Sequence, residues 1–457
     1  MQNIWTSKTL PLGSIGQSSE RADSQPSSKL TLRANFMWTL AGNIVYAASQ
    51  WGIVIVLAKL GSPEAVGKFA LALAMSAPVF MFSNLQLRGV QATDAAGEYR
   101  FGDYLGLRLI TTLVALLAIL ALTLVCGYRR ETAFVILLVG LAKAFESISD
   151  VFYGLQQQHE RMDRIAVSMM VKGLLSVAVF FLVFYFTGSL VWSVVSLATV
   201  WAVVLAVYDV RSGATTLGVV QNVQLVGIDQ QRASQLTLRS RLRFSIFVRL
   251  SWLALPLGIV MLLLSLNTNI PRFFIEHYLS ERDLGIFAAM AYLLTAGTTV
   301  VSALGQSASP RLAQYYVAGN YKAFRSLLLK LLNVGALIGG FGILVVLVAG
   351  PQILTLVYRP EYADHADVFL LLMVAAGIGY IASFLGYGMT AARYFKIQAP
   401  IFFAVCLTTA ISCLLFIPEK RLLGAALAIV ISTSLQMIVS LLVVRHTIHS
   451  SSERGTV

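Results

Sequence analysis

The sequence predicts an all-α integral membrane protein, with about twelve transmembrane helices in two six-helix lobes around a central cavity. Composition is the first observation: 57% of the residues are hydrophobic and 12% are charged, whereas a soluble chain carries about 25% charged residues. The second is a series of apolar runs long enough to cross a bilayer, since a hydrocarbon core of about 30 Å needs about 20 residues per helix. The third is a sequence pattern that recurs in both halves of the chain.

The apolar runs give the predicted spans. The longest polar stretch between them, residues 210–249, divides the spans six and six. Applying the length rule along the chain places the spans at 35–58, 65–88, 105–126, 132–155, 165–187, 189–209, 250–272, 283–305, 327–350, 367–390, 399–417 and 423–444.

Five regions follow from these limits. Residues 1–33 are polar and rich in Ser and Gln, which is typical of a disordered tail, and no apolar signal-peptide core follows a basic start. The others are an N-terminal six-helix lobe (34–209), a basic linker (210–249), a C-terminal six-helix lobe (250–444) and a second tail (445–457).

The positive charge of the chain fixes a predicted orientation. The net charge is +13, and most Lys and Arg residues lie in every second segment between spans. If the loop after the first span faces outward, these segments face the cytoplasm. Because cytoplasmic loops carry the excess of Lys and Arg, we expect the linker and both termini to be cytoplasmic. This pattern explains the charge without a nucleic acid partner.

A repeat relates the two halves. Val66-Gly67-Lys68-Phe69-Ala70 matches Leu284-Gly285-Ile286-Phe287-Ala288 at an offset of 218, and Gly97-Glu98-Tyr99-Arg100 matches Gly319-Asn320-Tyr321-Lys322 at an offset of 222. Both matches lie at equivalent places in the predicted halves, at the entry to the second span and in the loop after it. They indicate a duplication whose copies share one orientation, related by an axis along the membrane normal.

The most unusual stretch, Leu141 to Arg164, is charged although apolar runs flank it. Lys143, Glu146 and Asp150 are three and four residues apart, which places them on one helix face. An ionisable group at this depth costs roughly 2.5–3.5 kcal/mol. The face is therefore either the wall of a water-filled transport cavity or a charge cluster that joins helices, and Lys172 in the fifth span is its predicted partner.

Other spans carry polar residues at helical spacing. Hydroxyls, amides and aromatic rings suit a sugar, which offers hydrogen-bonding groups and flat faces. The same side chains also join helices to one another in membranes. The candidate cavity residues from these stripes in spans one, seven, eight and ten are Asn43, Gln50, Asn269, Tyr292, Gln306, Tyr380 and Tyr387.

Motifs for metal or cofactor chemistry do not occur. The three cysteines form no CxxC pair, and the sequence contains no HExxH, Walker-type or dinucleotide-binding glycine motif. We therefore predict no metal, no cofactor and no catalytic residues, and a protein that is not an enzyme.

Several motifs together resemble the bacterial polysaccharide-type flippases of the multidrug/oligosaccharidyl-lipid/polysaccharide exporter superfamily. The resemblance covers about residues 35–445. It rests on Leu60-Gly61 through Gly67-x-Phe69, Leu87-Arg88-Gly89-Val90-Gln91-Ala92-Thr93-Asp94, Glu146-Ser147-x-Ser149-Asp150-x-x-Tyr153-Gly154-x-x-Gln157, Asn269-x-Pro271-Arg272-Phe273 and Pro310-Arg311-Leu312-Ala313.

The resemblance implies export of an undecaprenyl-(pyro)phosphate-linked oligosaccharide across the bacterial cytoplasmic (inner) membrane, for lipopolysaccharide O-antigen, capsule or exopolysaccharide. Implied partners are this substrate, membrane lipids, a proton or sodium as coupling ion, and a polymerase with other polysaccharide-assembly proteins. Arg88 and Arg272 are the leading candidates for the phosphate, because a guanidinium binds phosphate through two hydrogen bonds. Lys143 and Lys172 come second.

Two alternatives remain open from the sequence. A cation-coupled small-molecule antiporter of the same superfamily would have an acidic cavity, whereas the candidate set here mixes cations with Glu146 and Asp150. A membrane glycosyltransferase or polysaccharide polymerase would need a sizeable extramembrane loop, and the longest predicted outer loop is only about residues 350–367.

Overall fold

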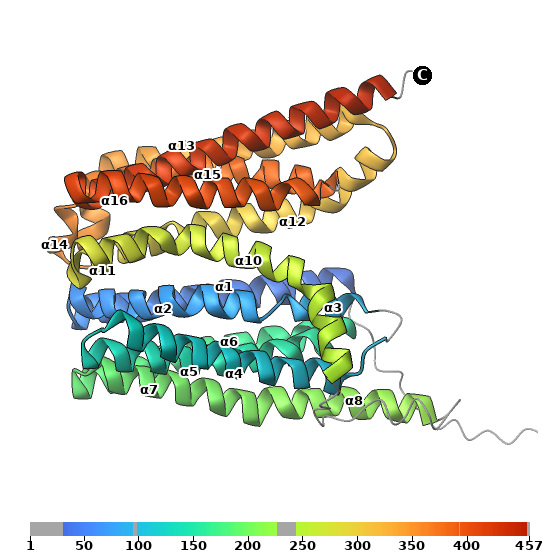
Figure 1. Cartoon of the computed structure of the whole chain (residues 1–457), viewed down its shortest axis with the longest axis horizontal. Coiled ribbons are helices and arrows are strands. Elements are labelled where there is room, and N and C mark those ends of the chain that lie inside the picture. The colour runs from blue at the N-terminus through green and yellow to red at the C-terminus, as the bar shows by residue number, and fades with distance from the viewer. Residues whose placement is uncertain (1–30, 95–97, 226–243, 393, 455–457) are drawn as a thin grey trace, which may run out of the picture.

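The computed structural model describes residues 31–94, 98–225, 244–392 and 394–454. Every regular element in this part of the chain is helical, and the helices lie roughly parallel in two groups (Figure 1). The N-terminal lobe contains α1 (Leu32–Leu60), α2 (Pro63–Ser83), α3 (Leu87–Thr93), α4 (Phe101–Cys126), α5 (Arg130–Gln158), α6 (Met162–Thr187), α7 (Leu190–Val204), the π-helical turn η1 (Leu205–Asp209) and α8 (Val210–Leu225).

The C-terminal lobe contains the remaining described helices. They form the yellow-to-red half of Figure 1, beside the blue-to-green N-terminal lobe. These helices are α10 (Phe244–Tyr278), α11 (Glu281–Leu293), α12 (Thr295–Val317), α13 (Tyr321–Val357), the short α14 (Pro360–Ala363), α15 (Ala366–Ala391) and α16 (Phe395–Arg454).

The helix count agrees with the predicted spans once α16 is divided. Among the described residues, 11 helices are long and apolar enough to cross a membrane. The last of them, α16, has 60 residues, and Arg421 within it is not helical (φ 53°, ψ −131°). Because 60 residues of helix extend about 90 Å, α16 supplies two spans that meet near Arg421, as the predicted spans 399–417 and 423–444 require.

Two predicted boundaries shift. The helix of the sixth span continues through η1 and α8 to Leu225, so the first part of the predicted linker is helical. Likewise α16 continues to Arg454, well into the predicted C-terminal tail. Most of the N-terminal tail, residues 1–30, and the basic linker from 226 to 243 lie outside the described residues.

The duplication predicted from the repeat is visible in helix starts. Ser62 caps α2 by accepting a hydrogen bond from the Ala65 amide, and Ser280 caps α11 by accepting one from the Asp283 amide. Side-chain capping of this kind satisfies amides that have no partner in the first turn. The two serines are 218 residues apart, which is the offset of the first sequence match.

The same repeat positions join the lobes. A Cβ atom added to Gly67 would collide with the carbonyl of Glu281, and one added to Gly285 would collide with the carbonyl of Pro63. Gly67 thus contacts Glu281, which lies four residues before Gly285. In the same way Gly285 contacts Pro63, which lies four residues before Gly67. This reciprocal contact is the geometry that a two-fold axis between α2 and α11 produces, and only residues without a Cβ allow so close an approach.

Further contacts between the lobes lie at the same end of the molecule, which we call the α14 end (Figure 1, left). The Lys59 ammonium donates to the Leu356 carbonyl at 2.7 Å, and Arg359 donates to the Lys59 carbonyl at 2.6 Å. The Trp51 indole donates to the Tyr358 hydroxyl at 3.1 Å. Burial raises the pKa of Tyr358. These hydrogen bonds join the two lobes at the α14 end.

The opposite end, which holds α8, is less closely joined. An apolar cavity of about 650 Å³ lies between α1, from Phe36 to Trp51, and the α11–α12 segment from Tyr292 to Ser307. At the surface, Arg249 and Glu98 form an exposed ion pair at 3.9 Å. The lobes are therefore packed at the α14 end and separated by a cavity toward the α8 end.

Candidate functional site

The charged face of α5 lies inside the N-terminal lobe. Lys143 and Glu146 form an ion pair at 2.6 Å, and the Tyr46 hydroxyl of α1 donates to Glu146 at 2.6 Å. The Lys143 and Glu146 side chains are 25% and 30% exposed. The contact with Tyr46 of α1 and the position of the Lys143 ammonium 5.3 Å from the centre of the Trp201 ring of α7 place the pair between helices of the lobe.

Asp150, one turn further along α5, joins three helices. It pairs with Arg108 of α4 at 3.0 Å and with Arg88 of α3 at 3.6 Å. Arg108 is completely buried and also donates hydrogen bonds to Asn84 and Ser147. The ion pairs of this cluster hold helices together, as in the helix-joining interpretation of the charged face, and Arg88 and Asp150 remain partly exposed.

A break in the second span positions Arg88. Leu85 and Gln86 adopt positive φ angles of 49° and 51°, which end α2 and turn the chain into the short helix α3. Arg88 then donates to Gln157 at 3.0 Å, lies 5.6 Å from the centre of the Tyr153 ring, and remains 33% exposed. A guanidinium with a carboxylate, an amide and an aromatic ring around it is fixed in place but can still bind an anion.

The predicted pair between Lys172 and this cluster is wrong. Lys172 is buried and donates to Ser149 at 2.9 Å and Tyr153 at 3.2 Å, and its charged partner is Asp209 at 3.8 Å. Two causes are visible. Lys143 satisfies Glu146 within α5, and the π-helical turn η1 brings Asp209 of the sixth span toward α6.

The candidates in the C-terminal lobe are more scattered. Arg272 donates to Asn269 on the same helix at 3.1 Å, and Asn269 is itself buried and donates to the Ser265 carbonyl. The Tyr380 hydroxyl of α15 donates to the Leu294 carbonyl, and the Tyr387 hydroxyl donates to the Ser302 carbonyl. Both bonds join α15 to the α11–α12 segment, as expected if these tyrosines hold helices together. Of the remaining candidates, Tyr292 lines the cavity between α1 and α12, Gln50 is half-buried, and Asn43 and Gln306 are exposed.

Sequence reasoning missed Arg108 and Asp209. Arg108 stands near the start of the predicted third span, but it is the eighth residue of α4 and is buried. Asp209 ends the predicted sixth span and so resembles a loop residue. The sequence contains one signal of their burial: no Gly, Pro or polar stretch separates Arg108 or Asp209 from the neighbouring apolar run.

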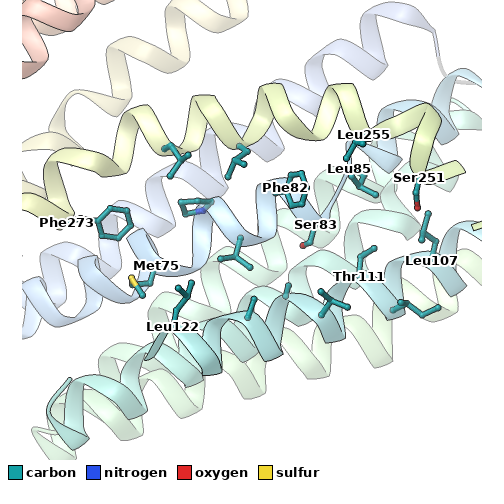
Figure 2. A pocket seen from close by; sticks show the side chains of 18 of the residues that line it. Met75, Phe82, Ser83, Leu85, Leu107, Thr111, Leu122, Ser251, Leu255 and Phe273 are labelled. Carbon is teal, nitrogen blue, oxygen red and sulfur yellow. The ribbon is translucent and has the colours of Figure 1, made fainter. Parts of the chain in front are cut away.

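A second, larger groove is apolar. It has a volume of about 1100 Å³ and lies between α4 and α10, with α2 behind them. Figure 2 shows Leu107, Thr111 and Leu122 on one side and Ser251, Leu255 and Phe273 on the other, with Phe82 between them. The groove contains none of the charged residues of α5, so it is separate from the polar candidate site.

Comparison with known proteins places the chain in a family. The sequence model of the family described as polysaccharide biosynthesis protein matches residues 32–316, and that of the MatE family matches residues 256–415. The chain is 28% identical over 406 residues to the capsular polysaccharide biosynthesis protein CapF of Staphylococcus aureus, covering 88% of this chain and 97% of that protein.

Solved structures agree on the fold. An inward-facing multidrug resistance MATE family transporter of the MOP superfamily matches with a TM-score of 0.68 at 13% identity, covering 91% of this chain and 99% of the other. A MOP superfamily transporter from Pyrococcus furiosus, described as having a binding pocket of reversed polarity, matches with a TM-score of 0.60 at 16% identity, covering 91% and 95%.

These findings define the class first: a multi-pass, two-lobed membrane protein with the fold of the MATE family transporters. Within that class, the chain belongs to the polysaccharide biosynthesis protein family. The resemblance stated from its motifs is therefore confirmed.

Proposed function

We propose that the protein is a flippase that moves an undecaprenyl-(pyro)phosphate-linked oligosaccharide across the cytoplasmic membrane. The observation that carries the proposal is the excess of cations in the charged core of the N-terminal lobe, because a transported phosphate is an anion. This core contains Arg88, Arg108, Lys143 and Lys172 against Glu146, Asp150 and Asp209.

The phosphate needs a compensating charge in the protein, since an ion that leaves water without one is strongly disfavoured. Arg88 is the leading candidate, because it is a third exposed and is held by Asp150 and Gln157. Arg272 is the candidate from the C-terminal lobe, and Lys143 follows. Lys172 is buried and would act through its charge rather than by contact.

The sugar would lie between the lobes, where amides and rings can meet it. Asn43 and Gln306 are exposed and Tyr292 borders the α1–α12 cavity, so these are the candidates for direct contact, with Gln50 beside them. Asn269, Tyr380 and Tyr387 already bond to nearby backbone or side-chain atoms and would support the wall behind the sugar.

The packing of the lobes supports alternating access. In this state the lobes meet at the α14 end and enclose a cavity toward the α8 end. Rocking the lobes about the Gly67–Gly285 contact would exchange the open and closed ends. Substrate can drive such a change only by binding the two states with different affinity.

Orientation in the membrane can be tested with single cysteines in a variant without the three native ones. We expect the α14 end to face outward, so cysteines at Gly61, Tyr128, Gly188, Pro360 and Lys420 should react with a membrane-impermeant thiol reagent in intact cells. Cysteines at Glu160 and Gly319 should react only after lysis. Labelling of Gly319→Cys in intact cells would contradict this orientation.

Transport itself requires purified protein in liposomes, with an undecaprenyl-linked oligosaccharide on one leaflet and an ion gradient. We expect the lipid to reach the other leaflet faster than in protein-free vesicles. Arg88→Lys keeps the charge but loses the two-pronged hydrogen bond, so its rate should fall between wild type and Arg88→Ala. A wild-type rate equal to that of protein-free vesicles would refute the flippase proposal.

A cation-coupled antiporter is the second candidate, supported by the MatE match over residues 256–415. The same liposomes distinguish the two functions. An antiporter would exchange an organic cation such as ethidium for protons or sodium. We expect such a cation to bind poorly at a site lined by Arg88 and Lys143. Exchange of ethidium without lipid transfer would favour the antiporter.

A further inference from the structure

A buried hydrogen-bonded chain in the N-terminal lobe connects an ammonium group to a carboxylate. The Lys172 ammonium donates to the Tyr153 hydroxyl at 3.2 Å, and Ser168 donates to Asp209 at 2.6 Å. Tyr153 and Ser168 are 2.8 Å apart. Because the Ser168 proton points to Asp209, the Tyr153 proton must point to Ser168, and all three bonds run in one direction from Lys172 to Asp209.

The two ends of this chain are not in direct hydrogen-bond contact. The Lys172 nitrogen lies 3.8 Å from the nearest Asp209 oxygen, beyond hydrogen-bonding distance. Their side chains are only 2% and 1% exposed. The buried charges are therefore connected through the two hydroxyls of Tyr153 and Ser168, and the Ser149 hydroxyl, which accepts from Lys172, also lies beside Asp209.

Lys172 has stabilising contacts besides Asp209. It donates to Ser149 at 2.9 Å, and its nitrogen lies 5.3 Å from the centre of the Tyr153 ring and 5.9 Å from that of Trp201. Aromatic faces attract cations. These contacts hold the ammonium independently of Asp209.

The backbone around Asp209 is also unusual. Residues Leu205–Asp209 form a π-helical turn between α7 and α8. Single π-helical turns inside α-helices occur frequently at functional sites. Here the turn carries Asp209 into the bundle, toward Ser168 and Lys172 of α6.

We propose that Lys172, Tyr153, Ser168 and Asp209 form a proton-binding site whose occupancy sets the charge that the N-terminal lobe presents to an anionic headgroup. The proposal rests on the flippase function proposed above. It adds a site on α5, α6 and η1 that the proposed phosphate contacts do not use.

The proton steps balance. In the first, Ser168 passes its proton to Asp209, Tyr153 passes its proton to Ser168, and Lys172 passes one to Tyr153. The ion pair becomes an amine and a carboxylic acid, with no change of total charge and no movement of heavy atoms. In the second, the amine takes up one proton that the aqueous phase supplies as hydronium, a water molecule is left behind, and the net charge of the site rises by one.

Other charged and titratable groups face this site and bear on any pH dependence. The cations among them favour the carboxylate form of Asp209, and the acids favour its protonated form. They are Lys143, Glu146 and Asp150 of α5, Arg164 of α6, Arg88 of α3, Tyr46 of α1, and Tyr208 beside Asp209.

Proton binding should strengthen anion binding. One added unit charge about 10 Å from a phosphate, at an effective dielectric constant of about 20, changes affinity on the order of tenfold. Linkage requires the converse, so a bound phosphate should favour proton uptake by the same factor. Farnesyl phosphate is a suitable probe, because it carries the phosphate without the sugar.

The proton itself can be observed by infrared difference spectroscopy between two pH values, as the C=O stretch of a protonated carboxyl group. We expect a band in wild type that disappears in Asp209→Asn. The matched control is Asp163→Asn at the start of α6, where Asp163 pairs with Arg161 and is 23% exposed; this variant should keep the band. Persistence of the band in Asp209→Asn would overturn the proposal.

A second variant covers the case in which Asp209→Asn fails to fold. Tyr153→Phe keeps both charged groups and the Ser168–Asp209 bond but interrupts the chain. After a pH jump, we expect the carboxyl band to form at least about tenfold more slowly than in wild type, the effect of a barrier raised by about 1.4 kcal/mol. An unchanged rate would exclude the hydroxyl chain as the proton path.

Binding of farnesyl phosphate provides the last measurement. In wild type its affinity should rise on the order of tenfold as the pH falls through the titration of the band, and in Asp209→Asn the rise should be lost. A pH-independent wild-type affinity would overturn the link to anion binding. Neither measurement requires transport, so a protein that titrates Asp209 but moves no lipid would contradict the proposed function and still support the proton site.

Discussion

The two lobes share an architecture but differ in polarity. Ser62 and Ser280 start equivalent helices, and Gly67 and Gly285 make equivalent contacts, so the duplication determines how the lobes are built and joined. The N-terminal lobe holds fully buried charges such as Arg108 and Lys172. In the C-terminal lobe, Arg272 forms a single hydrogen bond to Asn269 of its own helix.

The difference shows which features a duplication retains. Helix length, capping and close packing depend on local sequence and are satisfied in both copies. Buried charges depend on partners from several helices, so each must be assembled in one particular lobe. We infer that the shared features serve the movement of the lobes, and that the charged features of the N-terminal lobe serve the ligand.

The largest expected effect comes from leaving a buried cation of the N-terminal lobe without its carboxylate. Asp150→Ala removes the charged partner of Arg108, which is completely buried. We expect a loss of about 3–5 kcal/mol of unfolding free energy, measured by denaturant titration in detergent. Adding Arg108→Met should recover much of that loss, and a double variant no more stable than Asp150→Ala would contradict this explanation.

The next effect tests the symmetry of the lobes. Gly67→Ala and Gly285→Ala each place a methyl group against a backbone carbonyl of the other lobe, and overpacking typically costs about 1–3 kcal/mol. Because the contact is reciprocal, the two losses should be similar. Gly340→Ala is the control, since nothing lies within 4 Å of a Cβ at that position.

The same pair of glycine variants should loosen the α14 end. With the native cysteines replaced, cysteines at Lys59 and Leu356 should be joined by a bifunctional thiol crosslinker in the otherwise wild-type protein, because the Lys59 side chain reaches the Leu356 carbonyl. Crosslinking should fall in both glycine variants and remain in Gly340→Ala. A decrease in only one of them would break the proposed equivalence of the lobes.

A smaller effect is expected inside the C-terminal lobe. Tyr380→Phe removes the hydroxyl that donates to the Leu294 carbonyl, so we expect about 0.5–1.5 kcal/mol of destabilisation and an unchanged rate of lipid transfer. Thermal unfolding and the liposome assay measure the two quantities. A large loss of transport at normal stability would instead place this hydroxyl in contact with the substrate.

The smallest effect is expected at the surface. Lys68 and Glu131 form an ion pair at 2.5 Å, but the Glu131 side chain is 53% exposed. Exposed pairs contribute below about 1 kcal/mol and weaken with salt. Glu131→Gln should therefore have little effect on unfolding, and a loss comparable to that of Asp150→Ala would contradict the distinction between buried and exposed pairs.

The sequence by itself determined the membrane class, the approximate spans and the relation between the halves. These features follow from apolar run length and from local pattern, such as the repeat around Gly67 and Gly285, which any stretch of chain displays without reference to its neighbours. The charged face of Lys143, Glu146 and Asp150 was also readable, because helical spacing alone places three residues on one face.

Only the tertiary structure decided which charges meet. Lys172 pairs with Asp209, which lies in the π-helical turn at the end of the sixth span, rather than with the acidic residues of α5. Arg88 reaches Asp150 because Leu85 and Gln86 turn the chain at the end of α2. Pairing between distant residues depends on helix rotation and approach, and a local sequence pattern contains neither.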